Sequence, residues 1–95
     1  MTNATPDHEA LNNKGVAMGQ LGCYEEAISA FDAALAIKPD YPEALKNKGV
    51  TLRLLGRYEE AFSAFDTALA INPDDQDAIC NKGVALRLLG CSVKG

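Results

Sequence analysis

The sequence has few of the residues from which metal centres and catalytic sites are built. It contains a single histidine, His8, and three cysteines, Cys23, Cys80 and Cys91, of which no two form a Cys-x-x-Cys pair. A structural zinc site requires about four such ligands at close spacing, and one histidine near the chain end cannot serve a nucleophilic site. We therefore expect reduced cysteines, no metal, no cofactor and no enzymatic activity.

Positive charge and long apolar runs are also scarce. The 13 acidic residues outnumber the 9 basic ones and give a net charge of −4, whereas binding to a phosphate backbone depends on clustered cations. No segment reaches the roughly 18 consecutive apolar residues of a membrane span, and the first residues carry no secretory signal pattern. We therefore predict a cytoplasmic protein that binds neither nucleic acid nor membrane.

What the sequence does contain is a repeat with a period of 34 residues. The segment NKGV begins at residues 13, 47 and 81, and the segment YEEA begins at residues 24 and 58. A fixed period of this length is the signature of a repeat architecture. We divide the chain into a flexible N-terminal tail (1–7), a first repeat (8–39), a second repeat (40–73) and a half repeat with a short tail (74–95).

Each complete repeat is predicted to form two helices, because apolar or small residues recur at helical spacing in both of its halves. Gly22 and its equivalents Gly56 and Gly90 end the first helix of each unit, and a proline ends the second. Asp40, before Pro42, is placed to cap the next helix. We expect helices near 8–21, 25–38, 42–55, 59–72 and 76–89, and no strand.

Glycines in the middle of the first helices need an explanation, because each lowers the stability of a helix by about 1 kcal/mol relative to alanine. Gly15, Gly49 and Gly83 occupy this position. We interpret them as sites of close approach by the second helix, which brings small residues such as Ala61. Phe31 and Phe65 are expected to reach forward to the next first helix.

These residues resemble the tetratricopeptide repeat, whose pattern is an apolar residue, a small residue, a large apolar residue, and then Ala, an aromatic residue, Ala and Pro. The matching positions are Leu11, Gly15, Met18, Ala27, Phe31, Ala34 and Pro39; then Leu45, Gly49, Leu52, Ala61, Phe65, Ala68 and Pro73; then Ile79, Gly83 and Leu86. The resemblance implies an all-α solenoid of helix-turn-helix repeats with five helices. Its first helices would line a concave face.

The repeated asparagines of the first helices are not required by a core. An asparagine amide can pair with both the C=O and the N–H of an extended peptide, although these residues could equally be solvated or bond neighbouring helices. The resemblance thus implies a non-catalytic module that binds a peptide or partner segment in a concave groove. Its predicted residues are Asn12, Asn13, Val16, Lys46, Asn47, Val50, Cys80, Arg53, Asn81, Val84 and Arg87. Because Arg53 and Arg87 are basic, acidic or mixed peptides are favoured.

Family members that hold chaperone C-terminal carboxylates use a clamp of Lys, Asn, Asn, Lys and Arg. The corresponding residues here are Asn12, Val16, Asn47, Asp77 and Asn81. Only Asn47 keeps the residue type, and Asp77 places negative charge where a cation belongs. We therefore reject a carboxylate clamp.

Two further interpretations concern the repeated lysines and the exposed face of the last helix. The repeated lysines Lys14, Lys48 and Lys82 are expected to lie over helix seams or to pair with the acidic second helices.

The alternative function is a self-assembling structural unit, because terminal helices of soluble solenoids normally have polar outer faces and the last helix here does not. The expected homo-oligomer interface comprises Ile79, Leu86, Leu88, Leu89 and Val93.

Overall fold

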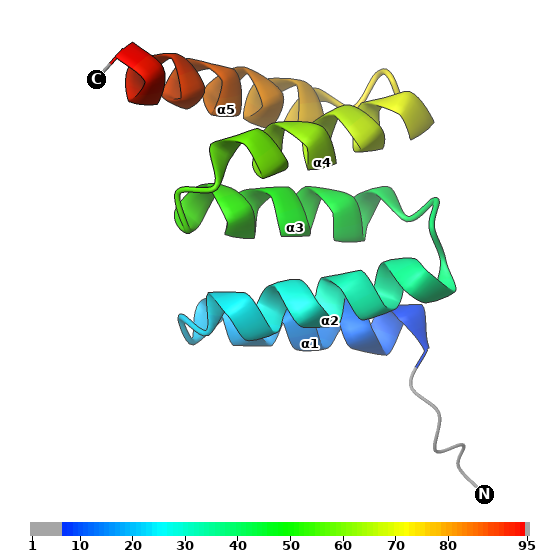
Figure 1. The fold of residues 1–95 in the computed structure, drawn as a ribbon. Helices are drawn as coiled ribbons and strands as arrows, with labels where there is room; N and C mark the ends of the chain where they lie inside the picture. Colours follow the sequence, from blue (N-terminus) through cyan, green and yellow to red (C-terminus); the bar gives the residue numbers. More distant parts are fainter. Residues whose placement is uncertain (1–6, 95) are drawn as a thin grey trace, which may run out of the picture.

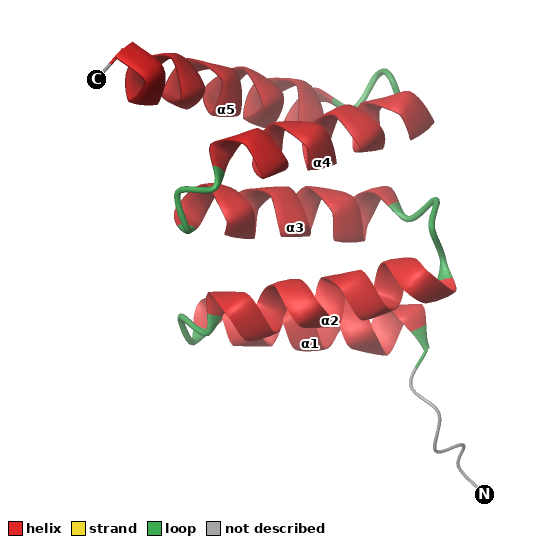
Figure 2. Ribbon diagram, viewed as in Figure 1, coloured by secondary structure: helices red, strands yellow, loops and turns green. Residues whose placement is uncertain are grey.

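The computed structural model describes residues 7–94, with side chains described through Gly90. It contains α1 (His8–Gln20), α2 (Tyr24–Ile37), α3 (Pro42–Leu54), α4 (Tyr58–Ile71) and α5 (Gln76–Lys94). Helices and loops account for this whole range, without a strand (Figure 2). The predicted all-α fold is confirmed, and every boundary except the last agrees to about one residue. Most of the predicted tail lies outside the described residues, while Asp7 caps α1.

The helices stack as successive antiparallel neighbours (Figure 1). The closest packing is between α1 and α2 and between α3 and α4, and α5 then packs on α4. The apolar spacing explains this order, because each helix has one stripe to bury and the next helix along the chain supplies the surface. The chain thus forms two helix pairs and one further first helix, α5.

The turn within each pair depends on a glycine in the left-handed region. Gly22 has φ 84° and Gly56 has φ 83°, and the next residues, Cys23 and Arg57, donate backbone hydrogen bonds across the turns. Gly90, at the equivalent position, does not adopt this conformation, and α5 continues to Lys94. The predicted helix end at residue 89 is therefore wrong. Within the described residues no second helix follows α5.

The first helices differ in how they begin. Asp7 and Asp75 cap α1 and α5, each accepting a hydrogen bond from a backbone N–H three residues later, at 2.8 and 3.2 Å. The equivalent residue before α3 is Tyr41, which makes no side-chain cap bond. The predicted cap at Asp40 is wrong because α3 starts at Pro42 and leaves Asp40 one residue too early. Tyr41 is buried instead, with its ring perpendicular to that of His8, and this burial raises its pKa.

The mid-helix glycines at 15 and 49 are explained by phenylalanine rings. A Cβ built on Gly49 would lie 2.6 Å from Cε1 of Phe65, and one on Gly15 would overlap the ring of Phe31. Both rings therefore pack on the glycine of their own pair, which the sequence analysis did not predict. Phe65 also belongs to a cluster with Ala85 of the next first helix, as expected. At Gly83 a Cβ would meet no described atom within 4 Å. The predicted close approach is thus absent there, because the described residues contain no second helix to make it.

The main core cluster lies between the two pairs. Phe65 is fully buried and belongs to one cluster with Ile28, Leu52, Ala61 and Ala85. These five residues come from α2, α3, α4 and α5, so the cluster connects four of the five helices. This cluster holds α3 and α5 in position beside each other.

Candidate functional site

A hollow of about 200 Å³ lies between α1 and α3, the first helices of the two pairs. A Cβ built on Gly19 would meet no described atom within 4 Å, so the missing side chain opens the space. Val16 and Leu54 are 36% and 54% exposed and give it apolar walls. We call this hollow the groove. It is lined by Gly15, Val16, Gly19, Gln20, Tyr24, Phe31, Asn47, Val50, Thr51 and Leu54.

An asparagine pair joins the two first helices beside the groove. Asn47 Nδ2 donates to Asn12 Oδ1 at 3.1 Å, and Asn12 is only 4% exposed. Of the alternatives for the repeated asparagines, bonding to a neighbouring helix is therefore the one observed for Asn47. Asn12 is placed to orient Asn47, whereas Asn13 is exposed and Asn81 is half-buried.

Of the predicted cations in the groove, Lys46 already has a partner. Its Nζ lies 2.7 Å from Asp75 Oδ2, and both side chains are largely covered. This contact, together with the backbone N–H of Ala78, lowers the pKa of Asp75 below its ordinary value of 3.8. Lys46 therefore holds the start of α5 against α3.

The Lys46–Asp75 pair gives stability a pH dependence. A carboxyl group whose pKa is lowered by folding stabilises the protein above its ordinary pKa, and this contribution is lost as the pH falls through the lowered value. We expect Asp75→Asn, which retains a capping oxygen, to lower the urea midpoint at pH 7, and the difference from wild type to vanish in acid. Asp74→Asn, at the exposed neighbour, is the control. A difference that persists unchanged in acid would contradict this assignment.

Two arginines remain available near the first helices. Arg53 Nε is buried and has no hydrogen-bond partner among the described residues, while Arg87 is exposed. A buried donor without a partner costs free energy unless an acceptor satisfies it.

The remaining predicted positions divide between groove and surface. Val50 lines the groove, while half-buried Val84 and exposed Cys80 lie on α3's neighbour α5. Of the residues that line the groove, sequence reasoning predicted only Val16, Asn47 and Val50. The residues that it missed are Gly15, Gly19, Gln20, Tyr24, Phe31, Thr51 and Leu54. The repeat period could have found Gly19, which lies one period before the predicted groove residue Arg53.

A sequence model described as Tetratricopeptide repeat matches residues 3–42 and 12–76. The chain belongs to the tetratricopeptide repeat family. No curated protein gives a significant match. The assignment to this family therefore rests on the family model, on the 34-residue period and on the helix pairs themselves.

Solved tetratricopeptide domains share this fold. The first domain of Spaghetti (RPAP3) bound to the HSP90 peptide SRMEEVD has a TM-score of 0.86 and 25% identity, over 87% of this chain and 66% of that one. The Sgt2 domain from Aspergillus fumigatus has a TM-score of 0.86 and 27% identity, over 90% and 57%. The first domain of human RPAP3 has a TM-score of 0.89 at 20% identity, over 95% and 71%, and shows the fold alone. This chain spans less than two thirds of the length of the Spaghetti and Sgt2 domains.

The tetratricopeptide lysines connect each first helix to the preceding second helix. Lys48 Nζ lies 2.7 Å from Asp32 Oδ1, and Lys82 Nζ lies 2.8 Å from Asp66 Oδ1. The predicted pairing is confirmed for these two lysines. Exposed pairs of this kind contribute about 0–1 kcal/mol each, so they tune the stacking of the repeats without determining it.

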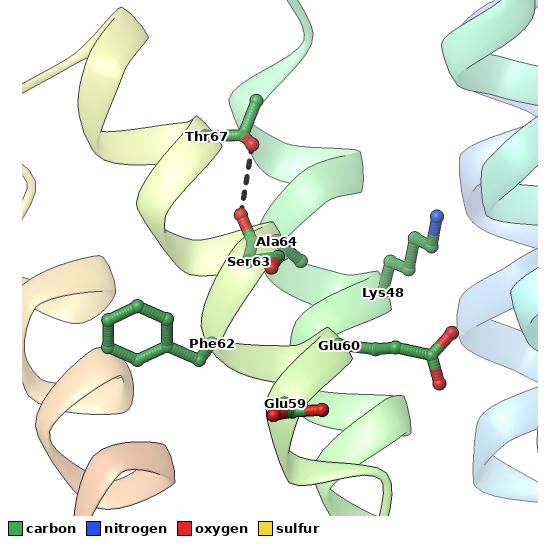
Figure 3. Close-up of a pocket in the computed structure, with 7 residues that line it drawn as sticks. All are labelled: Lys48, Glu59, Glu60, Phe62, Ser63, Ala64 and Thr67. Carbon is green, nitrogen blue, oxygen red and sulfur yellow. Dashed lines mark hydrogen bonds between the residues drawn. The ribbon is translucent and has the colours of Figure 1, made fainter.

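A second hollow, of about 550 Å³, lies along α3 and α4. Figure 3 shows Lys48 and Glu60 pointing to one side of α4 and Phe62 to the other. Arg57 Nε donates to Glu60 Oε1 at 2.6 Å, which lowers the pKa of Glu60. A general acid needs a raised pKa, so the lowered pKa of Glu60 does not suit it to that role. The lining residues are Lys48, Glu59, Glu60, Phe62, Ser63, Ala64 and Thr67.

The apolar residues predicted on the last helix are not equally exposed. Ile79 and Leu86 are 44% and 56% exposed, whereas Leu88 and Leu89 are half-buried. Leu89 lies beside the start of α4. Val93 lies outside the residues whose side chains the structure describes.

Over the part of the chain that is described, no helix is long and apolar enough to cross a membrane. The same residues contain no group of three or more His, Cys, Asp or Glu side chains arranged to hold a metal ion.

Proposed function

We propose that this chain is a non-catalytic interaction module that binds an extended peptide segment in the groove between α1 and α3. The observation that carries the proposal is the open space at Gly19, between the apolar walls of Val16 and Leu54. A peptide side chain placed there would bury apolar surface without moving a helix. The peptide complex of the similar Spaghetti domain supports peptide binding in general terms.

Polar groups around the groove favour backbone recognition and an acidic or mixed sequence. Asn47 lies in the wall and its amide oxygen can accept from a peptide N–H while its Nδ2 donates to Asn12. Arg53 and exposed Arg87 supply positive charge on α3 and α5. These groups would contact the backbone and the charges of a peptide and few of its individual side chains. We therefore expect the groove to accept peptides of different sequence.

A chaperone C-terminal carboxylate is not the ligand we propose. The clamp positions hold Asn12, which is buried, and Asp77, which is exposed and acidic. An exposed carboxylate at a position used for a cation would repel the terminal carboxylate of such a peptide.

The test is selection of peptides from a displayed random library on the whole protein, followed by titration of a selected synthetic peptide. We expect a dissociation constant on the order of micromolar, since a short groove offers few contacts. Gly19→Leu fills the groove and should weaken binding by about tenfold or more. Its helix should remain stable, because leucine is the better helix former.

Four further variants separate ligand contact from stability. Asn13→Ala and Asn81→Ala test the exposed and half-buried asparagines, while Asn47→Ala should also destabilise the fold by about 1–3 kcal/mol by leaving buried Asn12 unpaired. Gly83→Leu, on α5, should leave peptide affinity unchanged. Selected peptides whose affinity is indifferent to Gly19→Leu would contradict a binding site in this groove.

Self-assembly through α5 is the second candidate. It is favoured by the exposure of Ile79 and Leu86, and it predicts a molar mass by light scattering that rises with concentration and falls with Leu86→Lys. The cytoplasmic location likewise stays a prediction from the sequence.

A further inference from the structure

The ten residues that line the groove include none that is acidic or basic. An ionised side chain placed there would lose its water without gaining a partner of opposite charge. The volume of the groove, about 200 Å³, is smaller than the roughly 300–1,000 Å³ of sites for whole small molecules. Its walls include the exposed side chains of Val16 and Leu54, so the space suits one aliphatic side chain of a peptide.

Positive charge lies on the first helices that follow the groove. Gly19 of α1, Arg53 of α3 and Arg87 of α5 occupy equivalent positions, 34 residues apart. The first helices run in the same direction (Figure 1), so these three positions lie near the same ends of neighbouring helices. The repeat thus places an opening on α1 and an arginine on each of the next two first helices.

The edge of α3 that carries Arg53 faces α5. Lys46 lies two helical turns before Arg53 and therefore on the same face of α3, and Lys46 Nζ lies 2.7 Å from Asp75 Oδ2, just before α5. Val50 and Leu54 lie on the other edge of α3, where they line the groove beside α1. An extended ligand that starts in the groove and crosses α3 therefore reaches Arg53.

The two arginines differ from the neighbouring lysines in their ion pairs. Lys46, Lys48 and Lys82 each lie within 2.8 Å of a carboxylate oxygen. Arg53 and Arg87 form no ion pair with any carboxylate of the described residues. A guanidinium group binds a carboxylate through two parallel hydrogen bonds. Charge complementarity at this edge therefore favours a ligand with acidic side chains.

The width of α3 sets the spacing between the two ligand residues. A helix with its side chains is about 10–12 Å across, and an extended chain advances about 3.3 Å per residue. Crossing α3 therefore takes about three residues. Asn47 lies in the wall on this path and can pair with the ligand backbone, so the side chains between the two residues are not selected.

On the basis of the proposed function, we propose that the groove selects a peptide segment by two of its residues. A large aliphatic side chain enters the space at Gly19, and an acidic side chain about three positions away, on one side only, pairs with Arg53. Arg87 extends the preference for acidic residues in the same direction. Neither contact uses a terminal carboxylate, so the segment can lie inside a partner chain.

The experiment starts from peptides selected on the whole protein from a displayed random library. We expect the sequences whose binding is weakened by Gly19→Leu to share a leucine, isoleucine or methionine with an aspartate or glutamate about three positions away. One selected peptide is then synthesised with both ends blocked. Two versions replace its acidic residue by glutamine or its aliphatic residue by serine. Each replacement should weaken binding to the wild-type protein about tenfold.

A double-mutant cycle tests the ion pair with Arg53. Arg53→Gln should weaken binding of the acidic peptide about tenfold but scarcely change binding of the glutamine peptide, in which the pair is already broken. The matched control is Lys14→Gln, because Lys14 is exposed and lines a different hollow, together with Glu26. It removes the same charge and should leave both affinities unchanged. The glutamine peptide on wild-type protein tests the acidic residue even where Arg53→Gln fails to fold.

The results separate this inference from the proposed function. Peptides that depend on Gly19 but share no such spacing, or equal effects of Arg53→Gln on both peptides, would overturn the inference and leave the groove as a peptide site. Peptides indifferent to Gly19→Leu would overturn both. Loss of binding when the peptide ends are blocked would overturn the inference in favour of a terminal carboxylate. A molar mass that rises with concentration, but not in Gly19→Leu, would overturn it in favour of a second copy of the chain.

Discussion

Gly49→Leu is expected to lower the free energy of unfolding by about 1–3 kcal/mol or more, because it forces a side chain into a filled space. A Cβ at Gly49 would already lie 2.6 Å from Cε1 of Phe65. The ring cannot move aside cheaply, since Phe65 is fully buried in the cluster that connects four helices. Urea unfolding followed by circular dichroism measures the loss.

Gly83→Leu is the matched control, because Gly83 lies in the same NKGV segment one repeat later. No described atom lies within 4 Å of a Cβ at Gly83. Removing a mid-helix glycine should therefore stabilise the protein by about 0.5–1 kcal/mol. Equal destabilisation by both substitutions would mean that helix propensity or local sequence, and not the Phe65 contact, determines the effect.

Phe65→Ala is expected to be the most damaging truncation, with a loss of about 3–5 kcal/mol. The side chain is 0% exposed and packs with Ile28, Leu52 and Ala85 as well as its own helix. Small domains have total stabilities of about 5–15 kcal/mol, so this variant should be partly or wholly unfolded at room temperature. Loss of the helical circular dichroism signal, or a large fall in melting temperature, is the result to look for.

Phe62 provides a control on the same helix, three residues before Phe65. It is half-buried, and its ring lies 5.2 Å from Lys82 Nζ. Phe62 packs against the outside of the Phe65 cluster, and its partly exposed cation–π contact is worth about 0.5–1 kcal/mol. Because its side chain is only partly buried, Phe62→Ala should cost less than Phe65→Ala. Similar losses in the two variants would contradict the central role of the Phe65 cluster.

These stability predictions bear on the groove because its walls are held by the same contacts. Phe31 and Gly15 line the groove and also form the contact between α1 and α2. A rigid pair keeps Val16 and Gly19 in place before a ligand arrives, which reduces the ordering cost of binding.

The sequence by itself determined the five helices of the described residues, their boundaries except the end of the last helix, and most of the positions that form the core. This was possible because each of these properties depends on short-range patterns: glycines that permit left-handed turns, prolines that end helices, and apolar residues at helical spacing. The 34-residue period added redundancy, since each feature occurs two or three times. The candidate groove was predicted less completely, since only Val16, Asn47 and Val50 of its lining residues were expected there.

Only the tertiary structure decided what identical or equivalent residues do in different surroundings. The segment NKGV is packed under a phenylalanine in α1 and α3 and is open in α5. Gly56 turns the chain, whereas Gly90 continues a helix. Lys46 forms an ion pair with Asp75, and Asn47 donates a hydrogen bond to Asn12. The physical reason is that burial and pairing depend on which helix lies alongside, and that neighbour comes from distant parts of the chain, which a local pattern does not encode.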